Sequence, residues 1–310
     1  MYFCTAKLAI LNQTQKMKSR ILLIAFLFAA VLSAQERMEL VPFGDFEHWE
    51  SRQIKESRIL GGHTKTFYKM GGVWDCSNAH AKALGVEKVS VSVRPEKRGS
   101  GYCCRMETTL EVVTAIGIDL KALATGSIFT GKMLGVVGMR HSTDPNSAID
   151  MGVPFTKRPT ALVLDYKAVI QDKKAVYANA IKKVKELDVR DEGHITILLQ
   201  HRWEEDGHVY AYRVGTGVKK IDKTTADWVN DYRVPVEYGK PAVIKPYNAL
   251  CNNRQKTRNS QGKMVCIEEV DWRGDLTPTH MIIQISAGSM KPFMGCPGNV
   301  VWCDNIRLAY

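Results

Sequence analysis

The stretch ITILLQHRWEEDGHVYAYRV, residues 195–214, decides the fold class. In its first half, Ile195, Ile197 and Leu199 fall on one face and Thr196, Gln200 and Arg202 on the other, which is the period-two pattern of a half-buried strand. Asp206-Gly207 follows, and this dipeptide between two strand-like runs predicts a β-hairpin.

Further short strands extend in both directions from this hairpin. Residues 102–113 alternate apolar and polar side chains, and more strand-like segments follow at 128–139, 161–170, 234–238 and 281–286. Gly, Pro, Asn and Asp separate them, and no long helix intervenes. Strands of this length and spacing favour an all-β sandwich over an α/β sheet.

Two segments do not fit this pattern. Residues 172–188 are rich in Lys, with Tyr177, Ile181 and Val184 at helical spacing, so we expect a short surface helix or a long charged loop. Residues 247–275 are polar and long for a loop. We expect both to be insertions at the rim of the sandwich, where binding chemistry is often located.

The last residues, 300–310, read as a strand, and Asp304 falls on its apolar face. An unpaired carboxylate there is costly, so a cation or hydrogen-bond donors should meet it. Asp45 and Glu47 share a face near the start, and first and last strands are commonly neighbours in antiparallel sandwiches. Carboxylate ligands suit Ca²⁺, so we expect a structural calcium site at Asp45, Glu47 and Asp304. The alternative is that Asp304 caps a turn and Glu47 is solvated.

The N-terminal segment has the composition of an export signal. Basic residues after Met17 precede an apolar run at 21–32 and small residues at 33–34. We therefore expect an upstream extension and signal peptide over 1–34 and a single domain over 35–310. The apolar run is short for a bilayer span. Removal of 1–34 lowers the formal net charge from +11 to +7, which suits anionic glycans but is also explained by solubilising lysines.

The cysteines leave two hypotheses open. Residues 35–310 contain an odd number, so complete intramolecular pairing is excluded. Cys251 with Cys266, and Cys296 with Cys303, could close short loops, whereas Cys103 and the adjacent Cys104 point to opposite faces of a strand. Buried free thiols are the default expectation. The spacing of cysteines and histidines matches no zinc site.

A set of short motifs in a fixed order resembles the putative carbohydrate metabolism domain family of exported Bacteroidetes proteins. The matches run from about residue 41 to 310, in this order: Asp45-Phe46-Glu47-x-Trp49, Trp74-x-x-Ser77-Asn78, Gly101-Tyr102, Met106-Glu107-Thr108, Gly126-Ser127-Ile128-Phe129-Thr130-Gly131, Gly152-x-Pro154-Phe155-x-x-Arg158-Pro159-Thr160, Tyr166-Lys167 and Trp302-x-Asp304-Asn305-Ile306. The resemblance implies a jelly-roll β-sandwich related to carbohydrate-binding modules.

Glycan binding is accordingly the leading functional hypothesis. Aromatic faces and hydrogen-bonding groups recognise sugars, and we expect Trp74, Asn78, Arg158 and Tyr166 to form a ligand face for an oligo- or polysaccharide. No organic cofactor, nucleic-acid partner or membrane span is expected.

Two alternatives remain open. A glycoside hydrolase would need a carboxylate pair, for which Glu47, Glu107, Asp165 and Asp304 are available, but no pattern in the sequence distinguishes any of them as catalytic. A non-catalytic structural or adhesion protein of the cell envelope is the other alternative. The sequence contains no Gly-x-Ser-x-Gly elbow, phosphate loop or dinucleotide fingerprint.

Overall fold

The computed structural model describes residues 36–83, 85–115, 118–138, 141, 144–179, 184–251 and 255–310. The chain divides into two compact units, residues 1–38 and 39–310, and the second unit is described below. The expected upstream extension and signal peptide, residues 1–34, lie outside the described residues.

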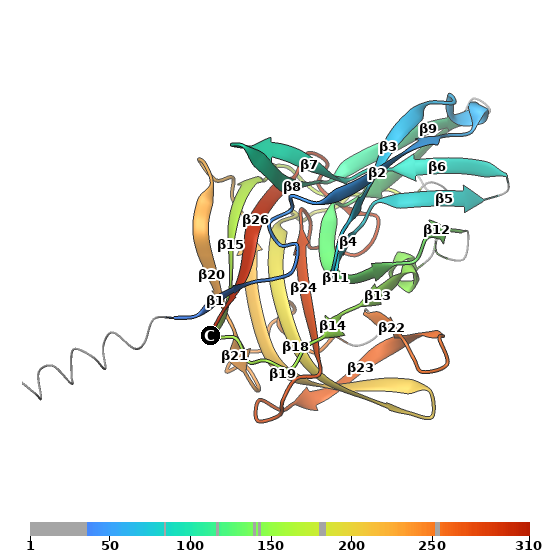
Figure 1. Ribbon diagram of the computed structural model, residues 1–310. Helices are drawn as coiled ribbons and strands as arrows, with labels where there is room; N and C mark the ends of the chain where they lie inside the picture. The colour runs from blue at the N-terminus through green and yellow to red at the C-terminus, as the bar shows by residue number, and fades with distance from the viewer. Residues whose placement is uncertain are drawn as a thin grey trace, which may run out of the picture. The chain divides into compact units, whose positions relative to one another are not determined.

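The first sheet combines the first strand, β1 (Met38–Leu40), and the last strand, β26 (Val300–Ala309), with four of the described strands from between them (Figure 1). Its strands are hydrogen-bonded in the order β20 (Val229–Pro235), β15 (Ala161–Val169), β26, β8 (Gly101–Glu107) and β7 (Val93–Arg98), with β1 also on β26. The last strand, β26, therefore lies inside the sheet.

A second, larger sheet is built around the long hairpin. Its strands run in the order β13 (Ile149–Met151), β11 (Ser127–Met133), β24 (His280–Ser286), β18 (Gly193–Glu205), β19 (His208–Ile221), β23 (Met264–Trp272) and β22 (Lys256–Arg258). Short strands extend it: β4 (Trp74–Cys76) on β11, β14 (Val153–Pro154) on β24 and β21 (Glu237–Tyr238) on β19.

Among the described residues, four smaller β-ladders and short 3₁₀ turns are separate from the two large sheets. The ladders are β2 (Trp49–Lys55) with β3 (Thr64–Met70), β9 (Thr109–Ala115) with β10 (Ile118–Ala124), β12 (Val136–Val137) with β5 (Ala79–Ala83) and β6 (Val86–Ser90), and β17 (Lys185–Glu186) with β16 (Val176–Tyr177) and β25 (Met294–Gly295). The 3₁₀ turns are η1 (Arg58–Leu60) and η3 (Pro145–Ala148). The described residues contain no α-helix.

The main core lies between the two large sheets. Leu162 and Leu164 of β15 and Met106 of β8 pack in one buried cluster with Ile195 and Ile197 of β18. Because the inner faces of two sheets bury apolar side chains against each other, the architecture is a β-sandwich. The all-β sandwich prediction is confirmed, and the non-consecutive strand order supplies the crossovers that a jelly roll requires.

The predicted hairpin is confirmed in detail. β18 and β19 pair antiparallel from Gly193 opposite Ile221 to Glu205 opposite His208. Asp206 and Gly207 connect them with φ angles of 50° and 78°, and two successive positive φ angles are those of a type I′ turn. Asp and Gly tolerate this conformation best, which explains why the dipeptide marks the turn.

Both segments contain strands. Residues 176–177 pair with 185–186 as β16 and β17. The other described residues of 172–188 are bends and loop and none is helical, so the long charged loop describes this segment better than the short helix. Residues 264–272 form β23, which pairs parallel with β19. Their charged residues obscured the strand pattern, because these strands lie at the margin of the sandwich, where few side chains need to be apolar.

Candidate functional site

Asp304, the carboxylate on the apolar strand, is neutralised by an arginine. It lies opposite Asp165 where β26 pairs with β15, and both carboxylates are at least nine-tenths buried. Arg98 Nη1 donates to Asp165 Oδ2 at 2.8 Å and to Asp304 Oδ2 at 2.7 Å. The two acceptor oxygens are therefore no more than 5.5 Å apart, the sum of these two bonds.

The backbone around this pair is irregular. The register shifts beside Asp165 in both of its strand pairings, and the neighbouring Asn305 and Asp231 both have a φ of 52°. Asn305 Nδ2 and the Asp231 amide each donate to Asp165 at 2.9 Å. The two bulges thus aim donors at a carboxylate that would otherwise be buried without enough partners.

The two carboxyl groups differ in acidity. Burial raises the pKa of Asp165, but the hydrogen bonds from Asn305, the Asp231 amide and Arg98 outweigh it and hold that pKa below its ordinary value. Burial also acts on Asp304, and there it outweighs Arg98, so the pKa of Asp304 is raised. A pair of acids with diverging pKa values is a pattern found in acid/base sites.

The predicted calcium site is not formed by Asp45, Glu47 and Asp304. Glu47 Oε1 instead accepts from the Tyr102 amide at 2.9 Å, and Asp304 is bound by Arg98. Within the described ranges no group of three His, Cys, Asp or Glu side chains could hold a metal ion. The sequence required a cation or hydrogen-bond donors at Asp304, and the Arg98 guanidinium and the Asn305 backbone amide meet it.

Trp74 and Asn78, half of the predicted ligand face, are structural. Trp74 is fully buried, packs edge-on against Phe46 and donates Nε1 to the Pro42 carbonyl at 3.0 Å. Asn78 is 2% exposed, donates to two carbonyls and accepts from the amides of Ser92 and Val93. Neither side chain has exposed surface through which it could contact a ligand.

Arg158 and Tyr166, the other half, lie apart from each other. Arg158 is exposed, lies over the Tyr238 ring and donates to the carbonyls of Gly274 and Leu276 at 2.6 Å. Tyr166 is 6% exposed and packs in the main core, edge-on to Tyr232. Arg158 therefore anchors a loop, and the predicted four-residue face is not assembled.

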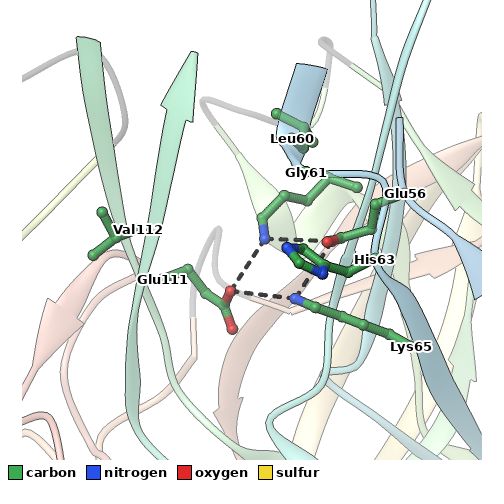
Figure 2. Close-up of a pocket in the computed structure, with 8 residues that line it drawn as sticks. Glu56, Leu60, Gly61, His63, Lys65, Glu111 and Val112 are labelled. Atoms are coloured by element: carbon green, nitrogen blue, oxygen red, sulfur yellow. Dashed lines mark hydrogen bonds and ion pairs between the residues drawn. The ribbon is translucent and has the colours of Figure 1, made fainter. Parts of the chain in front are cut away.

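A polar pocket lies between β3, β6, β9 and the segment that holds η1 (Figure 2). Its volume is about 330 Å³, and its lining is Glu56, Leu60, Gly61, His63, Lys65, Lys88, Glu111 and Val112. The Gly61-Gly62 turn, with φ angles of 92° and 63°, carries the chain from η1 back to β3 and so forms one rim.

Four charged groups alternate in sign around this pocket. Lys65 Nζ lies 3.4 Å from Glu56 Oε1 and 3.9 Å from Glu111 Oε2. Lys88 Nζ lies 3.4 and 3.2 Å from the same two oxygens. Close charge-assisted bonds measure about 2.7–2.9 Å. With two lysines and two glutamates the ring carries no net formal charge, and its four ion pairs are longer than such bonds.

Glu56 is the fixed member of the ring. Its side chain is 3% exposed, and its Oε1 accepts from the Val89 amide at 2.9 Å. Burial raises the pKa of Glu56, but the Val89 amide and the two lysines outweigh it, so the pKa is lowered. Glu56 is consequently ionised at neutral pH and acts as an acceptor.

A second concentration of aromatic side chains lies at the tip of the β18–β19 hairpin. Trp203 stacks on Tyr210 at 5.6 Å between ring centroids and on Tyr212 at 4.8 Å, with interplanar angles of 25° and 33°. The three side chains, which we call the hairpin stack, are partly exposed.

Sequence reasoning missed the pocket because its residues come from separate strands. All four charged residues are of types that are usually exposed. Lys65, Lys88 and Glu111 lie on strands, where a solvated face explains each one alone, and Glu56 directly follows β2. Only the strand placement brings them together. The Gly61-Gly62 dipeptide was the one local signal, since it marks the turn at the rim.

Comparison with known proteins gives one family match. The model of a family described as "Putative carbohydrate metabolism domain" matches residues 45–266. No curated protein matches the chain. In the part of the chain that the structure describes, no helix is long and apolar enough to cross a membrane.

Two solved structures are similar to the chain at 16% identity. One is a putative glycoside hydrolase from Bacteroides thetaiotaomicron, with a TM-score of 0.49 over 84% of this chain and 70% of that chain. The other is a putative glycoside hydrolase from Bacteroides vulgatus, with a TM-score of 0.46 over 85% of this chain and 96% of that chain.

Proposed function

The chain belongs to the putative carbohydrate metabolism domain family, and on this premise we propose that it is a glycan-binding protein whose charged pocket holds one sugar residue. We also propose that it is exported, as the composition of residues 1–34 indicates. Its partner would then be an oligo- or polysaccharide outside the cytoplasm.

The alternation of donors and acceptors around the pocket carries this proposal. Each sugar hydroxyl can donate one hydrogen bond and accept others. Lys65 and Lys88 supply only donors, and Glu56 and Glu111 supply only acceptors at neutral pH. Neighbouring hydroxyls placed in the ring would find both partners, whereas a ligand with a net charge would leave one pair of groups uncompensated.

The volume and the lining of the pocket also fit a single sugar residue. A volume of about 330 Å³ lies at the lower end of ligand pockets, which suits a single ring rather than a large cofactor. Leu60 and Val112 provide apolar surface beside the charged ring. A pyranose presents C–H groups on its faces and hydroxyls around its edge, so it matches both kinds of lining.

A glycoside hydrolase is the second candidate, favoured by the diverging pKa values of Asp165 and Asp304. A limit of 5.5 Å between their oxygens is compatible with the roughly 5–5.5 Å spacing of retaining enzymes. However, Arg98 Nη1 is bonded to both carboxylates and occupies the space that a glycosidic oxygen would need. The pocket offers no better pair, because the lowered pKa of Glu56 disfavours it as a general acid.

A glycan array followed by point variants tests the proposal. We expect wild type to bind a defined set of glycans and Lys88→Met to lose that binding. Trp203→Ala, in the distant hairpin stack, is the matched control and should bind like wild type. Absence of binding by wild type, or binding that Lys88→Met leaves unchanged, would contradict the pocket assignment. Release of reducing ends from a bound glycan would favour the hydrolase.

A further inference from the structure

We propose that Cys104 and Cys303 form a disulfide that joins β8 to β26 when the protein folds in an oxidising compartment. Both are free thiols in the structure. The inference is independent of the sugar-binding pocket, and it replaces the two pairings, Cys251–Cys266 and Cys296–Cys303, that sequence spacing allowed.

The strand register brings the two residues face to face. Cys303 pairs directly with Cys104 in the antiparallel ladder between β26 and β8. Directly opposed residues in such a ladder have Cα atoms about 4.5–5.5 Å apart, and disulfides span Cα separations of about 4.4–6.8 Å. The side chains of opposed residues leave the sheet on the same face, so a bond requires no change of register.

Their surroundings favour this pair over the other cysteines. Cys104 and Cys303 are both 0% exposed, belong to the main core and hydrogen-bond each other. Cys103 is adjacent in sequence but on the opposite face of β8, where its thiol donates to the Glu96 carbonyl. Cys76 is in the same core on β4 but has no register partner among the cysteines.

The oxidation has to occur before the core closes. Burial raises the pKa of both thiols in the folded protein, which suppresses the reactive thiolate. During folding, one thiolate attacks the disulfide of a thiol oxidoreductase and releases one of its thiols. The second thiolate then attacks this mixed disulfide and releases the other thiol. Two cysteine thiols are oxidised to one disulfide, and the oxidant's disulfide is reduced to two thiols.

The bond would fix the last strand of the fold. It closes a loop from residue 104 to residue 303, and long loops give the largest entropic stabilisation. It also lies next to the charged cluster, because Asp304 follows Cys303 and Arg98 lies on β7, the hairpin partner of β8. The disulfide would therefore join the strand that carries Asp304 to the β7–β8 hairpin that carries Arg98.

Peptide mapping of the full chain tests the proposal. The protein is unfolded, refolded in a mixture of oxidised and reduced glutathione, alkylated in denaturant without reduction, digested and analysed by tandem mass spectrometry. We expect the peptide containing Cys104 to be linked to the peptide containing Cys303, and the other cysteines to be alkylated. Reduction before thermal unfolding should lower the transition by roughly 5–10 °C.

Control variants assign the bond, because Cys103 and Cys296 lie near the proposed partners in sequence. Cys103→Ala and Cys296→Ala should retain the link, and Cys104→Ala should lose it. If Cys104→Ala fails to fold, the peptide map of oxidatively refolded wild type is sufficient to show whether Cys104 is linked to Cys303. Alkylation of both Cys104 and Cys303 after oxidative refolding, or a link from either of them to Cys76, would overturn the inference.

Discussion

Arg98 is the residue on which the buried charges of the sandwich depend. Its Nη1 serves Asp165 and Asp304, its Nη2 donates to Asn230 at 2.8 Å, and its guanidinium lies 3.9 Å over the Trp228 ring. Removal of one partner from a buried ion pair leaves an uncompensated charge, which costs more than the pair itself contributes.

We therefore expect Arg98→Met to lower the free energy of unfolding by about 3 kcal/mol in urea denaturation. Arg94→Met is the matched control on the same strand, because its ion pairs are 3.9 and 4.0 Å long and its side chain is 46% exposed. That control should change stability by less than about 0.5 kcal/mol. Equal effects of the two variants would show that Arg98 does not act through the buried carboxylates.

Glu56 makes the free energy of unfolding depend on pH in the acid range. Its folded-state pKa is lowered, so its stabilising contribution is fully present above the ordinary pKa of 4.5 and is lost as the pH falls below that value. At neutral pH, Glu56→Gln should lower the free energy of unfolding by about 2 kcal/mol. Urea titrations at several pH values should show this difference shrinking in acid. A difference that is constant with pH would contradict the role of the charge.

For single residues, the sequence predicted that the Asp304 carboxylate needs a partner but not which residue provides it. Strand parity placed Asp304 among core residues and required a cation or hydrogen-bond donors there, and Arg98 and the Asn305 backbone amide meet it. Arg98 could not be identified as that cation, because it comes from a hairpin 206 positions away along the chain. The same limit explains Trp74, because it is buried by Phe46 and the main core, which no local pattern encodes.

The β18–β19 hairpin shows how much local chemistry can determine at the scale of one element. Its Asp206-Gly207 turn and its alternating strand were both predictable, because a type I′ turn demands residues that tolerate positive φ. The partners of the hairpin were not predictable. β24 pairs antiparallel on one side and β23 pairs parallel on the other, and the sequence carries no signal for that choice.

Replacement of the turn glycine tests the local account. Gly207 has a φ of 78°, and a side chain there costs about 1 kcal/mol, so Gly207→Ala should lower the free energy of unfolding by about that amount. Gly135→Ala is the control, because an added Cβ would meet nothing within 4 Å and its φ is not in the left-handed region. If the two variants were equally stable, the turn would not require a glycine.

For the whole molecule, the fold class followed from the sequence because period-two alternation recurs along the chain. The candidate sites did not follow, because each is assembled from separate strands whose pairing no local pattern encodes. The predicted calcium site is the clearest case: the two chain ends do carry carboxylates, but the β7–β8 hairpin supplies a guanidinium to Asp304 and a backbone amide to Glu47.

This arrangement predicts that calcium does not hold the molecule together. A chelator should leave the thermal unfolding midpoint unchanged, and added calcium should not raise it, because Asp304 already has a bound cationic partner. Differential scanning calorimetry with and without each additive checks this. A midpoint that rises with calcium concentration would restore the calcium hypothesis.

We propose above that the pocket of Glu56, Lys65, Lys88 and Glu111 binds a sugar residue. Calorimetric titration with the best-binding glycan from the array measures this binding in wild type and in Glu111→Gln, which keeps the shape of the side chain but removes its charge. We predict at least a roughly tenfold weaker affinity for Glu111→Gln, equivalent to about 1.4 kcal/mol for one charged hydrogen bond. The same affinity in both proteins would contradict the claim.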